Sequence, residues 1–301
     1  MHQNATPNPL PVRSFSAGGR RYRLIAPLGR GGMGRVYEAE VEGIGSRVAV
    51  KVLQPSDAID AREQRLRFAR EAEILTELRH PNIVRILDFV EAPDGKLFLV
   101  MERVGGENLR DLLLVEGHLA ELRILSIAKQ IASALGEAHR NGIVHRDLKP
   151  ANVHVVSSGA GRERVVVLDF GVGKQLDEDT GQQLTGLGRY VGSMPYSSPE
   201  QLLTGPLDGR SDIYSLGVSM FEMATGLVPF AASSPMDLVD MHLHHEAPSF
   251  RKVFPACRVS ARTEEIVRRC MAKSPQDRWQ SADQLAAALG AGWDEMPTKP
   301  R

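Results

Sequence analysis

The segment His145-Arg146-Asp147-Leu148-Lys149-Pro150-Ala151-Asn152 is the most informative part of this 301-residue chain. An aspartate such as Asp147 can orient an attacking hydroxyl group and accept its proton. Lys149, two residues later, can neutralise a phosphate group in transfer. Asn152, five residues after the aspartate, can bind a metal ion through its amide oxygen. The spacing therefore indicates metal-dependent phosphate chemistry.

A second candidate metal ligand follows a short apolar stretch. Residues 165–168 (Val-Val-Val-Leu) predict a buried strand, and Asp169-Phe170-Gly171 comes directly after it. A carboxylate at a strand end before glycine suits Mg²⁺, which prefers oxygen ligands. Asp-Phe-Gly is also a common loop sequence, so this motif is weak by itself.

A glycine-rich pattern near the N-terminus predicts a phosphate-binding loop. Residues 29–36 read GRGGMGRV, with glycines that let backbone N–H groups approach phosphate oxygens. A dinucleotide-binding fingerprint would require a helix right after the last glycine. Residues 36–41 alternate as a strand instead, which favours a hairpin turn over phosphates. An ordinary glycine-rich hairpin turn is the alternative.

Lys51 lies inside an apolar predicted strand, in the motif Val48-Ala49-Val50-Lys51. A buried lysine requires an anionic partner, whereas one on an edge strand can point to solvent. The helix predicted over about 61–78 offers several carboxylates. Glu71 shares a helix face with Leu75 and Leu78, and so we expect it to turn inward toward Lys51. The competing carboxylates are Glu63, Glu73 and Glu77.

The pattern of elements changes once along the chain. Strands are predicted over residues 22–28, 35–42, 47–53, 83–89 and 96–104. Helices dominate after Gly105-Gly106 and are predicted over 121–141, 211–225, 236–244, 263–272 and 281–289. This predicts an α+β fold with a small antiparallel lobe, a short joint and a larger helical lobe. Residues 1–20 and 291–301 are expected to be flexible tails.

Composition excludes several classes of protein. The 37 Lys+Arg balance 37 Asp+Glu, so the basic excess of a dedicated nucleic-acid binder is missing. No run approaches the ~20 apolar residues of a membrane helix, and residues 1–12 do not resemble an export signal. Cys257 and Cys270 fit no disulfide framework, which favours a reducing, cytoplasmic location. His242, His244 and His245 lack a clear fourth ligand for a metal site.

Taken together and in this order, the motifs resemble those of the eukaryotic-type protein kinase family. Ser198-Pro199-Glu200 completes the set, and the resemblance covers about residues 22–289. The segments GRGGMGRVYEA, HPNIVRILDF and YSSPEQ are similar to the bacterial Ser/Thr subgroup. The resemblance implies a bilobal kinase fold, with an N-lobe over 21–103 and a C-lobe over 104–290.

The resemblance also implies residue roles. Asp147 would be the catalytic base, and Lys149 would contact the γ-phosphate. Lys51 would contact the α- and β-phosphates and pair with Glu71. Mg²⁺, or Mn²⁺, would be held by Asn152 and Asp169. The ATP pocket would comprise Leu28, Gly29, Gly31, Gly32, Gly34, Val36, Ala49, Lys51, Met101, Glu102, Val104 and His154. His154 departs from the family, which usually has Leu, Met or Phe there.

Further positions follow from the same resemblance. Thr180, Thr185 and Ser193 are candidate phosphorylation sites in the activation loop over 169–200, and phospho-Thr185 is expected to meet Arg146. Ser193 stands where the family usually has a threonine whose hydroxyl bonds the catalytic Asp and Lys. Glu200 is expected to pair with Arg278, and Asp212 to brace the backbone of the catalytic loop.

The implied function is that of a Ser/Thr protein kinase in bacterial signalling. It would transfer the ATP γ-phosphoryl group to protein hydroxyls and autophosphorylate its activation loop. Protein substrates are expected partners, nucleic acid is not, and a homodimer through the N-lobe is a further arrangement seen in such kinases. A nucleotide-binding pseudokinase scaffold is the alternative, although no catalytic residue is missing. A small-molecule phosphotransferase would usually lack the Ser-Pro-Glu segment.

Overall fold

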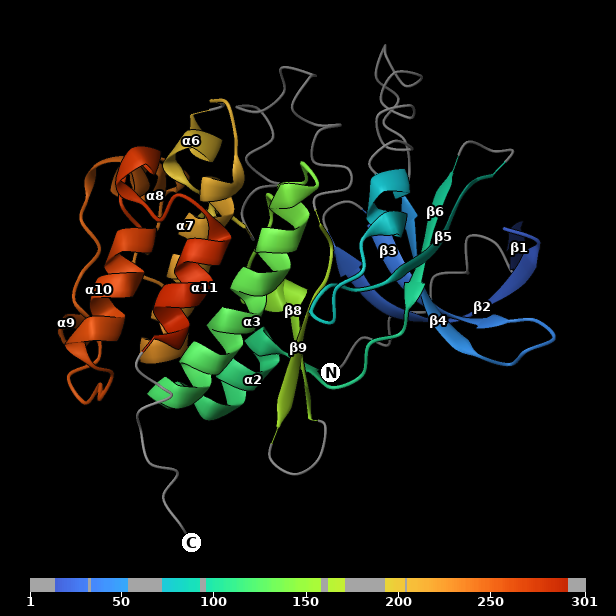
Figure 1. Ribbon diagram of the computed structural model, residues 1–301, viewed down its shortest axis with the longest axis horizontal. Coiled ribbons are helices and arrows are strands. Elements are labelled where there is room, and N and C mark those ends of the chain that lie inside the picture. Colours follow the sequence, from blue (N-terminus) through green and yellow to red (C-terminus); the bar gives the residue numbers. More distant parts are fainter. Residues whose placement is uncertain are drawn as a thin grey trace, which may run out of the picture. The chain divides into compact units, whose positions relative to one another are not determined.

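The computed structural model describes residues 14–31, 34–53, 72–92, 96–157, 162–170, 193–203 and 205–291. They form two compact units (Figure 1). Unit 1 contains the described residues up to Glu77 together with Arg85–Val104. Unit 2 contains Leu78–Val84 and the described residues from Gly105 onward.

Unit 1 is built on one antiparallel sheet with the strand order β1-β2-β3-β4-β6-β5. Its apolar core lies on one face, where Tyr22, Val50 and Phe98 are almost completely buried. β-branched and aromatic side chains at alternate positions favour these strands. The strands are β1 (Ser14–Ala17), β2 (Arg20–Gly31), β3 (Gly34–Val41), β4 (Arg47–Leu53), β5 (Ile86–Glu91) and β6 (Leu97–Glu102).

The expectation that residues 1–20 form a flexible tail is wrong for its last part. Residues 14–17 form β1, which pairs with β2 through a turn at Gly18 and Gly19, both at positive φ. The Phe15 ring stacks on Tyr22 at 5.2 Å and on Phe98 at 4.4 Å between centroids. The segment is therefore fixed by aromatic packing and by a strand ladder.

Unit 2 is mainly helical and is organised around α7 (Gly209–Thr225), which is buried along most of its length. The side chain of Asp208 caps the helix start, and Gly226 at φ 77° ends it. α3 (Glu121–Arg140) packs against α7 and α11. The other helices are α2 (Leu109–Glu116), α6 (Pro199–Leu202), α8 (Pro235–His244), α9 (Phe250–Val253), α10 (Ala261–Cys270) and α11 (Ala282–Gly290).

A small sheet in unit 2 carries the loops of the candidate site. Its order is β7-β8-β9, with β7 (Glu107–Asn108), β8 (Val153–Ser157) and β9 (Glu163–Val167). Short 3-10 turns occur at η1 (Pro150–Asn152), η2 (Met194–Tyr196) and η3 (Pro275–Asp277). Because η1 leads directly into β8, the 145–152 loop is anchored to this sheet.

The α+β class and the strand-rich and helical parts are as predicted, but some boundaries differ. The predicted strand over 83–89 runs over 86–91 instead, because Val84 N–H bonds the Val167 carbonyl in unit 2. Residues 78–84 thus belong to unit 2, and Val104 to unit 1. Of the helix predicted over 61–78, residues 72–77 are helical and residues 61–71 lie outside the described residues. None of the described helices has the length and apolarity needed to cross a bilayer.

Candidate active site

The loop over residues 145–152, called here the catalytic loop, brings its polar side chains together. Lys149 Nζ donates to Asp147 Oδ2 at 2.9 Å and to Ser193 Oγ at 2.6 Å. Asn152 Nδ2 donates to the Asp147 carbonyl at 2.8 Å and to its Oδ2 at 3.2 Å. The Asp147 carboxylate is therefore held in place by an ammonium and an amide.

His145 holds the catalytic loop in place from its buried side. Its side chain is completely buried, and Asp147 N–H donates to Nδ1 at 3.2 Å. Nε2 must then carry the proton, and it donates to the Leu168 carbonyl at 2.8 Å. Burial lowers the pKa of His145, so the ring stays neutral at pH 7. The loop is thus tied to the residue that precedes Asp169.

Asn152 and Asp169 form a suitable pair of ligands for a hard cation. Leu168 N–H donates to the Asn152 carbonyl at 2.8 Å, which brings the backbone that leads into Asp169 alongside Asn152. Because the Asn152 Nδ2 donates to Asp147, its Oδ1 is not used in these bonds and can serve as a metal ligand. Asp169 has a φ of 54°, a backbone strain that costs about 1 kcal/mol or more for a residue with a side chain. An amide oxygen beside a carboxylate fits Mg²⁺.

Asp212 of α7 supports the catalytic loop from inside unit 2. Its carboxylate accepts from His145 N at 2.8 Å, Arg146 N at 2.9 Å and His139 Nε2 at 2.8 Å. Burial alone would raise the pKa of Asp212, but the hydrogen bond and charge of His139 hold it below the ordinary range. The prediction that Asp212 braces this backbone is confirmed.

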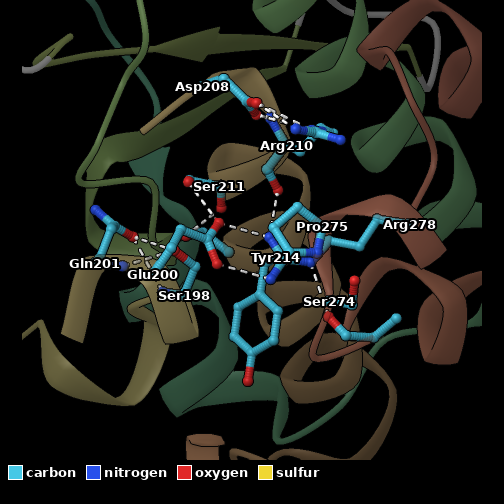
Figure 2. Close-up of polar contacts among 12 residues, drawn as sticks. Ser198, Glu200, Gln201, Asp208, Arg210, Ser211, Tyr214, Ser274, Pro275 and Arg278 are labelled. Carbon is cyan, nitrogen blue, oxygen red and sulfur yellow. Dashed lines mark hydrogen bonds and ion pairs between the residues drawn. The ribbon is translucent and has the colours of Figure 1, made fainter. Parts of the chain in front are cut away.

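Glu200 and Arg278 form a buried ion pair (Figure 2), as predicted. Arg278 Nη1 and Nη2 donate to the two Glu200 oxygens at 2.7 and 2.8 Å. The other three N–H groups of Arg278 donate to carbonyls of Ala272, Arg210 and Lys273. Burial opposes ionisation of Glu200, yet the pairing with Arg278 lowers its pKa below the usual value. The fork-shaped guanidinium therefore has all five donors satisfied.

Gln201 is a positioning residue that the sequence reasoning missed. Its Nε2 donates to the Arg146 carbonyl at 2.8 Å, and so α6 holds the catalytic loop directly. Its Oε1 accepts from the Ser198 N–H in a capping box at the start of α6. The Ser-x-x-Gln spacing over 198–201 is the sequence signal for such a box.

Residues 193–198 are anchored on α7 and α8. Tyr196 Oη donates to Glu222 Oε2 at 2.6 Å, and Ser215 Oγ donates to the Tyr196 carbonyl at 2.7 Å. Met194 is buried against Phe230 and Leu238. These contacts determine where Ser193 presents its hydroxyl to Lys149.

Unit 1 carries the predicted nucleotide-binding residues on neighbouring strands. Lys51 is 6% exposed, which excludes the solvent-facing alternative, and its Cα partner on β3 is Val36. Ala49 pairs with Met101 across β4 and β6, and both are buried. Gly34 has no room for a side chain, because a Cβ there would lie 2.3 Å from the Val52 carbonyl oxygen.

The remaining predicted residues are more exposed or are not described. Leu28 and Gly29 lie on β2, with Leu28 48% exposed, and Glu102 Oε1 accepts from Arg85 N at 3.1 Å. Gly31 pairs with Gly34, and Val104 is half-buried. In unit 2, His154 Nδ1 lies 3.3 Å from the Gly105 carbonyl oxygen. The positions outside the described residues are Gly32, Glu71, Thr180 and Thr185, so the Lys51–Glu71 pair stays a prediction.

These features define the protein kinase class, and a sequence profile described as "Protein kinase domain" matches residues 22–288. The chain belongs to this family. It is 40% identical over 272 residues to serine/threonine-protein kinase pkn3 of Myxococcus xanthus, covering 90% of this chain and 50% of that protein. It is 38% identical to PknB of Mycobacterium tuberculosis, covering 89% of this chain and 42% of PknB. The chain therefore spans half or less of these relatives.

Solved structures agree with this assignment. The kinase domain of Mycobacterium tuberculosis PknI matches with a TM-score of 0.68 and 29% identity. The match covers 92% of this chain and 98% of that one. Rad53 in complex with AMP-PNP matches with a TM-score of 0.73 at 24% identity, over 88% of this chain and 64% of that one, which supports the fold alone.

Proposed function

We propose that this chain is the catalytic domain of a Ser/Thr protein kinase in bacterial signalling. It transfers the ATP γ-phosphoryl group to protein Ser and Thr hydroxyls and autophosphorylates its own activation loop. The observation that carries the proposal is the constellation of Asp147, Lys149, Asn152 and Ser193. The Ser/Thr-kinase names of the relatives support it.

The contacts of each side chain support its role in the transfer. Lys149 and Asn152 orient the Asp147 carboxylate, which positions the substrate hydroxyl and accepts its proton. Lys149, held between Asp147 and Ser193, supplies a fixed positive charge for the phosphate oxygens. Mg²⁺ bound at Asn152 and Asp169 would neutralise charge on the ATP phosphates. Lys51 is the residue of unit 1 that would bind the α- and β-phosphates.

The pseudokinase alternative is not favoured. A scaffold that only binds nucleotide needs no ordered aspartate base, yet two side chains hold Asp147 in place. His145 is fixed as the neutral tautomer that fits Asp147 N–H. Such preorganisation is expected where charge must be stabilised in a transition state.

The test is transfer of label from γ-labelled ATP to the chain and to a generic basic protein, with Mg²⁺ or Mn²⁺. Asp147→Asn removes the base, and Asp240→Asn is the matched control on the exposed face of α8. We expect wild type and the control to place label on Ser and Thr, and Asp147→Asn to place almost none. Label on tyrosine alone would refute the Ser/Thr assignment. No transfer with a nucleotide-dependent rise in melting temperature would favour the scaffold.

Location, regulation and assembly complete the proposal. A cytoplasmic location suits ATP chemistry and the buried free thiols of Cys257 and Cys270. Phosphorylation of Thr185 is expected to order the activation loop, so mass spectrometry should find this residue modified when activity is full. Dimerisation through unit 1 should be visible as a concentration-dependent mass in sedimentation.

A further inference from the structure

His242 of α8 is a buried histidine that the proposed reaction does not use. Its side chain has no exposed surface, and Nδ1 lies 2.8 Å from Tyr214 Oη of α7. Among the residues that the structure describes, Nε2 has no hydrogen-bond partner. By contrast, His244 at the end of α8 and His245 just after it are exposed and contact Asp240. His242 is therefore separate from the surface histidines, although all three are close in sequence.

The groups that face His242 disfavour a positive charge on its ring. Lys273 Nζ donates to the carbonyls of Met241 and His242 at 3.1 and 2.7 Å, and lies 4.3 Å from the centre of the Phe230 ring. Protonation would place hydrogens on both ring nitrogens. Tyr214 Oη can accept one of them, and no described acceptor is available for the other.

The carboxylates of this region are either engaged with other groups or exposed to solvent. Arg278 lies 4.9 Å from the centre of the Tyr214 ring, and Figure 2 shows the Tyr214 hydroxyl directed away from this guanidinium. Glu200 is paired with Arg278. On α8 itself, Asp237 is exposed and Asp240 bonds the two surface histidines. Within the described part of the chain, a protonated His242 would thus be acted on by the Lys273 ammonium with no carboxylate to balance it.

Apolar contacts connect α8 to the catalytic loop. Leu238, one helical turn before His242, packs with Phe230 against Met194. Met194 follows Ser193, whose hydroxyl accepts from Lys149 at 2.6 Å. Because packed side chains transmit displacements with little slack, a movement of α8 would shift Ser193 relative to Lys149.

We propose that His242 is a pH-responsive positioning residue for phosphoryl transfer. The neutral ring keeps α8 packed in its observed position and so holds Ser193 against Lys149, and protonation favours a state in which α8 is displaced. This inference rests on the proposed kinase function. Burial and then the charge of Lys273 lower the pKa of His242 to about 4. The displaced state, with an ordinary pKa of about 6.5, binds protons more readily, so acid favours it. At about pH 5.5 the ratio of the displaced to the packed state should be about tenfold higher than at alkaline pH.

The first experiment measures kcat and the KM for ATP on a peptide substrate between about pH 5 and 8. His242→Asn keeps an oxygen for Tyr214 and cannot titrate, and His244→Asn is the matched exposed control. We expect kcat of wild type and His244→Asn to fall more toward acid pH than kcat of His242→Asn, by at most about the tenfold change in that ratio, with the KM for ATP unchanged. Where His242→Asn is too unstable to purify, His242→Gln replaces it. Superimposable profiles of all three proteins would overturn the inference.

The second experiment does not depend on activity. The methyl resonance of Met194, assigned with a Met194→Leu variant, is followed by NMR against pH together with the histidine ring resonances. We expect it to move with the midpoint of His242 in wild type and to stay constant in His242→Asn. The inference would be overturned if the titration midpoint of His242 equalled that of His244, or if the Met194 methyl resonance did not change with pH. Loss of transfer at every pH would refute the proposed function, and this NMR arm would still decide the coupling.

Discussion

Removing the guanidinium of Arg278 should destabilise unit 2 strongly. The side chain is completely buried, and two of its five N–H bonds reach the Glu200 carboxylate at 2.7 and 2.8 Å. Arg278→Met keeps most of the volume but leaves a buried carboxylate unpaired. Breaking one side of such a pair costs about 3–5 kcal/mol, a large share of the about 5–15 kcal/mol that stabilises a typical domain.

The pH dependence of this loss has a defined sign. In wild type, Arg278 lowers the pKa of Glu200, so the stabilisation is present above the unfolded pKa of about 4.5 and is lost as pH falls through the folded value. In Arg278→Met burial dominates, which raises the pKa of Glu200 instead. The difference in unfolding free energy between the two proteins should therefore be larger at pH 7 than near pH 5.

The assay is urea unfolding followed by far-UV circular dichroism at both pH values. Arg268→Met is the matched control, because Arg268 is 64% exposed and lies 3.6 Å from Glu264, and should change stability by less than about 0.5 kcal/mol. In the double variant with Arg278→Met and Glu200→Gln, the loss of unfolding free energy should be smaller than the sum of the two single losses. The coupling free energy should be about 2 kcal/mol. A loss below about 1 kcal/mol for Arg278→Met, or additive effects, would refute the reasoning.

Three shorter predictions concern the loop and the first strand. Gln201→Ala frees the Arg146 carbonyl and should lower kcat about tenfold with little change in the KM for ATP; an unchanged kcat in steady-state assays would contradict the role of α6. Ser193→Ala removes the hydroxyl that Lys149 contacts and should lower kcat about tenfold, with recovery in Ser193→Thr; activity equal to wild type would refute this contact. Phe15→Ala should destabilise unit 1 by about 2 kcal/mol, measured by calorimetry, and an unchanged melting temperature would show that β1 is dispensable.

The short-range motifs of unit 2 allowed the sequence to predict which of its polar side chains lie together. Asp147, Lys149 and Asn152 lie within six residues, so the loop alone brings them together. The partners Glu200 and Arg278 are 78 residues apart, and only the family resemblance connected them. The role of Gln201 in capping α6 could have been predicted from the sequence, because the Ser-x-x-Gln spacing of the capping box is local.

Long-range packing explains what sequence could not predict. Prolines and glycines near Phe15 suggested a tail, but its ring stacks on Phe98, which is 83 residues away. His242 appeared equivalent to its exposed neighbours in sequence. Its helix places it inward against Tyr214, a contact that helical periodicity alone does not reveal.

The most direct test of the central claim is single-turnover phosphoryl transfer by wild type and Asp147→Asn, with nucleotide affinity measured on the same samples. If Asp147 orients and deprotonates the hydroxyl, the variant should transfer at least about 100-fold more slowly while binding ATP within about twofold of wild type. Transfer by Asp147→Asn within about tenfold of wild type, at equal affinity, would contradict the assignment of this loop as the catalytic centre.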